Sequence, residues 1–264
     1  MIPKIIHLCW FSGEEYPELI KLCLKSWEEN LPDFKIKVWT KEMALATNIK
    51  FVKEAISVEK WAFAADVIRL YALYTEGGIY MDSDIAVRSR FDHFMNDKLV
   101  LFQEYHLQMV KKTKTNKIDK NGYNLNIGKF VTGIGIQAAF MMSEKGHPFV
   151  KTLLSHYENR NFIRIDGTYD VDVIAPAIYA SYAEKIGYRY MDEIQKLDNI
   201  TIYPSKYISS SYYEINKDSF SLHCCAHSWF KPSFIMRVKR IIKKFFNMNT
   251  KTNVDIVNDF LYRI

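Results

Sequence analysis

Hydrophobic and polar positions follow two different periods between residues 4 and 84 of the chain. Short apolar, β-branched runs indicate buried strands, and longer stretches with apolar residues three and four apart indicate helices. This pattern predicts strands at 4–10, 34–40 and 78–84, and helices at 17–32 and 57–78. Strands that alternate with helices in this way are typical of an α/β sheet with crossover helices.

Several residues mark the expected element boundaries. Pro17 is tolerated in a first helical turn, Ser57 is the expected N-cap of the second helix, and Gly77 is its expected C-terminal stop. The polar, lysine-rich stretch 105–130 predicts a long surface loop. The rest of the chain predicts a strand, a turn and a helix within 135–160, a helix at 172–187, and within 200–209 a strand that ends at Pro204.

The composition is that of a globular protein with an uneven charge. The 264 residues include 25% charged and 15% aromatic residues, and the net charge is +6. Residues 231–251 hold seven lysines and arginines and no acid, so the remainder of the chain has a net charge of −1. Because the basic character belongs to this tail and not to the body, we expect no nucleic-acid partner.

The cysteine content and the hydropathy pattern bear on localisation. Four cysteines in this length make no disulfide framework. The first residues have no long apolar signal core, and no run of about 18 apolar residues predicts a membrane span. We expect a cytoplasmic protein with one domain at 1–232 and a basic amphipathic tail at 233–264. Residues 233–250 suit either the inner face of an anionic membrane or a helix packed on the body.

Two carboxylates, Asp82 and Asp84, close the third predicted strand. Residues two apart in a strand face the same side, so these side chains are expected to converge. Two such charges ionise together only near a cation, and carboxylates suit Mg²⁺ or Mn²⁺ with a diphosphate. Asp66 and Arg69 share a face of the preceding predicted helix. They form either a structural salt bridge or a polar clamp for substrate hydroxyls.

A third polar cluster is "LHCCAHSWF" at 222–230, which contains two histidines and two adjacent cysteines. This spacing fits no common zinc motif, so zinc is disfavoured. A carboxylate pair with one histidine suits Mn²⁺, and that histidine is either His223 or His227.

An ordered set of motifs resembles family 32 glycosyltransferases, the DxD sugar transferases of capsular polysaccharide synthesis. More distantly, it resembles the glucosyltransferase domains of the large clostridial toxins. The set is "IPKIIHLCWFSG", "SWEENLPDFKIKVWT", "AFAADVIRLYALYTEGGIYMDSD" and a closing H-x4-SW, close over 2–90 and loose over 130–230. The resemblance implies a GT-A fold, a nucleotide-sugar donor, a divalent Mn²⁺ or Mg²⁺ ion and transfer with retention at the anomeric carbon. We expect a UDP-hexose rather than GDP-mannose as the donor.

The resemblance also implies roles for residues that would bind the donor. Trp10 would stack on the donor base, and Asp66 and Arg69 would hold the donor sugar. Asp82 would contact the ribose or the sugar, directly or through a metal-bound water. These positions are taken from the matching motifs in this sequence.

For the metal and the diphosphate, the resemblance implies Asp84 and His223 as ligands of the ion, together with Asp82. Ser228 and Trp229 would touch the diphosphate. The family often shows a second histidine directly after the first, where this chain has a cysteine, and His227 takes a small-residue position. Which histidine binds the metal therefore stays open.

The sequence thus predicts a metal-dependent retaining glycosyltransferase of bacterial surface polysaccharide synthesis, acting on a saccharide or lipid-linked saccharide. Its expected catalytic residues are Asp66, Arg69, Asp82 and Asp84. One alternative is a HAD-like phosphatase, whose D-x-D usually lies near the chain start and wants Thr or Val where this chain has Ala86. The other is a sugar-nucleotide- or membrane-binding module without turnover.

Overall fold

The structure is a computed structural model that describes residues 1–105, 110, 117–126, 128–131, 133–210, 212–226 and 251–262. The strands are β1 (Ile5–Cys9), β2 (Lys35–Trp39), β3 (Gly78–Met81), β4 (Ile85–Val87), β5 (Leu99–Tyr105), β6 (Ile134–Ile136), β7 (Phe140–Ser143), β8 (Gln195–Leu197), β9 (Ile200–Tyr203), β10 (Ile208–Ser209) and β11 (Ser221–His223). The helices are α1 (Glu18–Asn30), α2 (Lys41–Ala46), α3 (Lys50–Ser57), α4 (Trp61–Glu76), α6 (Pro148–Glu158), α7 (Ala175–Glu184) and α9 (Asn253–Tyr262), with 3₁₀ turns η1 (Asp92–Phe94), η2 (Ser205–Tyr207) and η3 (Tyr212–Glu214).

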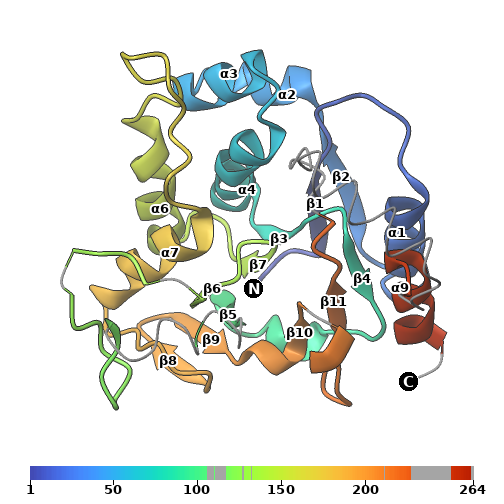
Figure 1. Cartoon of the computed structure of the whole chain (residues 1–264). Coiled ribbons are helices and arrows are strands. Elements are labelled where there is room, and N and C mark those ends of the chain that lie inside the picture. The colour runs from blue at the N-terminus through green and yellow to red at the C-terminus, as the bar shows by residue number, and fades with distance from the viewer. Residues whose placement is uncertain are drawn as a thin grey trace, which may run out of the picture.

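Within these residues, a large mixed sheet has the strand order β2-β1-β3-β7-β5-β9-β8, with β6 paired to β5 (Figure 1). A smaller sheet has the order β10-β11-β4. Strand β1 is parallel to both β2 and β3, whereas β7 is antiparallel to β3 and β5. The predicted α/β class is therefore confirmed.

The order of the first three strands creates a switch point. The chain passes from β1 through α1 to β2 on one side of β1, and then through α4 to β3 on the other side. Side chains of α1 and α4 belong to different hydrophobic cores, so the two crossovers cover opposite faces of the sheet. Ligands of such sheets bind at the carboxyl ends of the strands where the order reverses. Here that place lies beyond the ends of β1 and β3.

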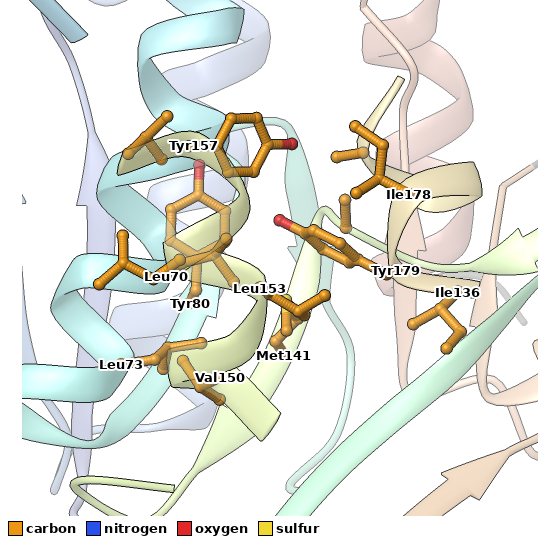
Figure 2. Close-up of a cluster of buried hydrophobic side chains, with 14 of the residues drawn as sticks. Leu70, Leu73, Tyr80, Ile136, Met141, Val150, Leu153, Tyr157, Ile178 and Tyr179 are labelled. Carbon is orange, nitrogen blue, oxygen red and sulfur yellow. The ribbon is translucent and has the colours of Figure 1, made fainter. Parts of the chain in front are cut away.

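Alternate residues of the central strands enter the two cores. In β3, Ile79 and Met81 pack into the core that contains α1, and Tyr80 packs into the core beneath α4. Figure 2 shows part of this second core, with side chains from α4, α6, α7 and the sheet. Each fully buried aliphatic side chain contributes roughly 1.5–3 kcal/mol. This double burial fixes the end of β3 between two helical layers.

The helix predicted at 57–78 corresponds to α4, which begins only at Trp61. Ser57 is the last residue of α3, not the N-cap of α4, and no side chain caps the start of α4. The chain turns between the helices at Glu59, whose φ is 57°. Gly77 ends α4 as predicted, with a φ of 70°. A Cβ on Gly78 would lie 2.5 Å from a backbone oxygen of β1, so the tight reversal into β3 requires glycine.

The other predicted elements agree with the structure, except that the third strand ends at Met81. The stretch 105–130 is described only in part, and 227–250 lies outside the described residues, including the predicted amphipathic segment at 233–250. Helix α9 packs against α1, where Val257 and Phe260 are buried with Cys23. The proposed boundary between residues 232 and 233 stays a prediction. None of the described helices is long and apolar enough to cross a membrane.

Candidate active site

The predicted site residues gather at the switch point. Trp10 directly follows β1, and Asp82 directly follows β3. The parallel register pairs His7 with Tyr80, which brings the ends of the two strands level. The Trp10 amide also donates to the Trp39 backbone oxygen at the end of β2, at 3.0 Å. Three carboxyl-terminal strand ends therefore meet at one edge of the sheet.

The Trp10 indole is half-buried at this edge. Its Nε1 donates to the Glu14 backbone oxygen at 2.8 Å, and its ring lies 4.7 Å from the ring of Tyr16, measured between centroids. The neighbouring loop therefore orients an aromatic surface beside the strand ends, as base stacking would require.

Asp82, Asp84 and His223 come together in space. Each offers a ligand atom, and these atoms lie within 4.8 Å of one another. The two aspartates converge through a turn and not through strand alternation, because the Ile85 amide donates to the Asp82 backbone oxygen at 3.1 Å. Strand β4 then pairs with β11, with Ile85 opposite His223. This pairing carries the histidine, 139 positions after Asp84, to the carboxylates.

The Asp84 carboxylate is held from two sides. Its Oδ2 accepts the Ala226 backbone amide at 2.8 Å, and its Oδ1 lies 3.6 Å from His223 Nε2. The Asp84 backbone oxygen accepts the Cys224 amide at 3.0 Å. The chain after β11 therefore fixes both the backbone and the side chain of Asp84.

The electrostatic field at this cluster is negative. Burial is the largest single influence and lowers the pKa of His223, but Asp84, Cys225 and Asp82 together outweigh burial and raise the pKa to about 10. A field that favours a proton between these groups also favours a divalent cation. Among the described residues, the candidate ligand group consists of two carboxylates and one imidazole.

Asp82 belongs to a second network. The Tyr80 hydroxyl donates to Asp82 Oδ1 at 2.6 Å, and one guanidinium nitrogen of Arg69 lies 3.7 Å from the same oxygen. That nitrogen also lies 2.9 Å from Asp66 Oδ1, and the guanidinium stacks 4.6 Å above the Tyr80 ring. Sequence reasoning missed Tyr80, although its position two residues before Asp82 on the strand was an available signal.

The Asp66–Arg69 pair lies in a buried environment. Arg69 is 4% exposed. Burial raises the pKa of Asp66 to about 6, although the charge of Arg69 opposes this increase. Buried ion pairs contribute little net stability because desolvation offsets the attraction. A contribution to stability alone therefore explains poorly why a charged pair occupies this position.

The structure thus brings together five of the predicted residues, with Trp10 at the same edge: Asp66, Arg69, Asp82, Asp84 and His223. His227, Ser228 and Trp229 lie outside the described residues, so their expected roles stay predictions. A carboxylate cluster at the switch point of a mixed α/β sheet is typical of proteins that bind a metal and a diphosphate.

Residues 17–101 match the model of the family described as "Glycosyltransferase sugar-binding region containing DXD motif". The chain is 36% identical over 103 residues to inositol phosphoceramide mannosyltransferase 2 of Schizosaccharomyces pombe, which covers 36% of this chain and 28% of that protein. It is 29% identical over 153 residues to inositol phosphoceramide mannosyltransferase 3 of the same organism, which covers 56% of this chain and 35% of that protein. The chain therefore aligns with about a third of the length of these curated relatives.

Two solved structures are similar in overall arrangement. One is the PaToxG glycosyltransferase, with a TM-score of 0.45, 18% identity, and coverage of 70% of this chain and 69% of that chain. The other is the galactosyltransferase LgtC in complex with donor and acceptor sugar analogs, with a TM-score of 0.42, 12% identity, and coverage of 94% and 97%. The structure itself shows a mixed α/β sheet flanked by helices, the fold class that was expected.

Proposed function

We propose that this protein is a metal-dependent retaining glycosyltransferase that moves a hexose from a nucleotide sugar to a saccharide or lipid-linked saccharide acceptor. One observation carries the proposal. The ligand atoms of Asp82, Asp84 and His223 lie within 4.8 Å of one another, beside the buried Asp66–Arg69 pair. A phosphate-binding cation and a polar clamp for a sugar are both needed for this reaction, and the two clusters adjoin.

The three side chains fit a divalent cation. Two carboxylates and one imidazole suit Mn²⁺, and Mg²⁺ also favours carboxylate oxygens with water or phosphate as further ligands. The backbone amide of Ala226 orients the Asp84 carboxylate before any ion arrives. When bound, such an ion stabilises the negative charge that develops on the leaving diphosphate.

The remaining residues act on the donor directly. Asp66 would accept hydrogen bonds from the sugar hydroxyls, and Arg69 supplies a fixed positive charge beside them. Because Arg69 is buried, water screens its charge only weakly. Tyr80 holds Asp82 in place at 2.6 Å, and Trp10 offers a ring to the donor base. Attack by the acceptor on the same face, with the departing phosphate as base, would give retention.

The donor and the acceptor are separate hypotheses. The sequence resemblance favours a UDP-hexose, whereas the two fungal relatives are named mannosyltransferases, which makes GDP-mannose the competing donor. Their names also give inositol phosphoceramide, a lipid, as their acceptor. A lipid-linked acceptor, including an intermediate of a bacterial surface polysaccharide, agrees with the basic segment 233–250 as a membrane contact.

The test is release of nucleotide from a panel of UDP-glucose, UDP-galactose and GDP-mannose, each with Mn²⁺, with Mg²⁺ and with a chelator. We expect metal-dependent release of nucleoside diphosphate from one donor class. A parallel reaction with p-nitrophenyl phosphate tests the phosphatase alternative. Cleavage of that ester alone, or metal-dependent binding of a nucleotide sugar without any turnover, would contradict the proposal.

A further inference from the structure

Three buried tyrosines, Tyr80, Tyr157 and Tyr179, belong to the core beneath α4 (Figure 2). The Tyr80 hydroxyl donates to Asp82 at 2.6 Å, and the Tyr179 hydroxyl lies 3.5 Å from the Asp66 backbone oxygen. Tyr157, on α6, differs from both. It is 4% exposed, and its hydroxyl oxygen has no hydrogen-bond partner among the described residues.

An unpaired hydroxyl in a core is uncommon, because most buried polar atoms in native proteins have a partner. The ring of Tyr157 is well packed, with an edge contact to Phe51 at 5.2 Å between centroids. A phenylalanine would fill the same space without leaving a donor unsatisfied. Packing alone therefore does not explain why this position carries a tyrosine and not a phenylalanine.

The surroundings of this hydroxyl point toward Asp66. Burial raises the pKa of Tyr157 well above its ordinary value, and the carboxylate of Asp66 and the hydroxyl of Tyr179 add to the increase. In Figure 2, the hydroxyls of Tyr157 and Tyr179 both point into the space between the two rings. Tyr157 is therefore a neutral donor that lies near the Asp66–Arg69 pair.

The Asp66 carboxylate is partly exposed and has acceptor capacity beyond its ion pair. Its Oδ1 lies 2.9 Å from Arg69, and no other side-chain partner is found for it in the described part of the chain. Tyr179 approaches the backbone oxygen of Asp66 and not the carboxylate. Among the described residues, a phenol without an acceptor thus belongs to the core beneath α4, the helix that carries the partly buried Asp66 carboxylate.

We propose that Tyr157 is a positioning residue of the donor-sugar subsite. Its hydroxyl donates a hydrogen bond to the Asp66 carboxylate when that carboxylate turns to accept the hydroxyls of a bound hexose. This inference rests on the proposed function, because it requires a hexose donor at Asp66. Within the described residues of the free protein this donor is unpaired, and the complex with a nucleotide sugar pairs it.

The experiment compares Tyr157→Phe with the matched control Tyr188→Phe. The Tyr188 hydroxyl is equally buried but donates to Gln103 at 2.6 Å and also lies 3.3 Å from the Gly135 backbone oxygen. Thermal unfolding without ligands is measured first. We expect Tyr157→Phe to unfold at the wild-type temperature or higher, since it loses no hydrogen bond, and Tyr188→Phe to unfold at a lower temperature.

Kinetics with the donor that the wild type uses give the second readout. We expect kcat/KM of Tyr157→Phe to fall roughly tenfold or more, the size of a lost hydrogen bond to a charged group, and that of Tyr188→Phe to stay unchanged. Loss of this donor also raises the pKa of Asp66, so the acidic limb of the pH profile of Tyr157→Phe should move to higher pH. A structural role of the hydroxyl would not move this limb.

Each outcome decides the inference. A wild-type kcat/KM in Tyr157→Phe overturns it, and so does a lowered unfolding temperature, which would show that the hydroxyl is already paired in the free protein. If the wild type releases nucleotide from no donor, the proposed function fails and this inference fails with it. If the wild type is active and Tyr157→Phe behaves like it, only the inference fails.

Discussion

The two acidic centres of the site, Asp84 and Asp66, are held in different ways. Asp84 accepts a backbone amide at 2.8 Å and lies beside His223. Asp66 is partly buried in a helical layer. In the described residues Arg69 is its side-chain partner, and the core beneath the same helix contains the unpaired hydroxyl of Tyr157. The metal side is therefore assembled in the free protein, whereas the sugar side has donors and acceptors that await a ligand.

This difference follows from the elements that build each side. The metal side is made by the turn between β3 and β4 and by the chain that leaves β11, so backbone groups are free to bind the carboxylate. The sugar side is made by α4, α6 and α7, whose backbone groups are already used within helices. Only side chains can serve Asp66 there, and a tyrosine hydroxyl is one of the few donors that a core accommodates.

The largest effect is expected from a substitution on the metal side. Asp84→Asn should reduce metal-dependent turnover by at least roughly 100-fold, because stabilisation of the leaving diphosphate by an ion is worth several kcal/mol. The fold should be retained, since an asparagine can still accept the Ala226 amide. The matched control is Asp33→Asn, which removes a surface carboxylate bonded to Arg90 at 2.8 Å and should leave turnover unchanged. Wild-type turnover in Asp84→Asn would refute the assignment of the metal side.

The second-largest effect is expected from a substitution on the sugar side, and it concerns the free energy of unfolding. Arg69→Met leaves the buried Asp66 carboxylate without its cation, and loss of one partner of a buried pair costs about 3–5 kcal/mol of unfolding free energy. Urea denaturation of the two proteins measures the difference. Arg90→Met, at an exposed pair, should change stability little. Equal stability of Arg69→Met and the wild type would show that Asp66 is not held by this charge.

A smaller effect is expected in the pH dependence. Burial raises the pKa of Asp66 from 3.8 to about 6, so the folded protein holds this proton more tightly than the unfolded chain does. The contribution of Asp66 to stability therefore falls as the pH rises through this range, by up to about 3 kcal/mol. Relative to the wild type, Asp66→Asn should become more stable between pH 4 and pH 7. A difference between the two proteins that does not vary with pH would contradict the burial of this carboxylate.

Local patterns were sufficient to predict much of the fold. The strand at β1 and the helix α1 follow from periodicity within short windows, and Gly77 from the need for a positive φ at a helix end. The break between α3 and α4 was missed because Glu59 adopts a positive φ, which no signature of a glutamate indicates. Ser57 was predicted as an N-cap because serine is a preferred residue type at that position, but it is the last residue of α3.

The candidate site was predictable where its residues are close in sequence. Spacing alone paired Asp66 with Arg69 and Asp82 with Asp84, although a turn brings the second pair together. The amide of Ala226 on Asp84 and the hydroxyl of Tyr157 near Asp66 depend on tertiary packing between distant segments. No local pattern carries that information.

The most direct test of the account measures Mn²⁺ binding in the presence of a nucleoside diphosphate. The electron paramagnetic resonance signal of the free ion reports how much Mn²⁺ is bound. We predict one bound ion per chain in the wild type, no binding in Asp84→Asn, and binding weakened roughly tenfold or more in His223→Ala. Asp33→Asn should bind as the wild type does. Wild-type affinity and stoichiometry in Asp84→Asn would contradict the claim that Asp82, Asp84 and His223 form the metal site.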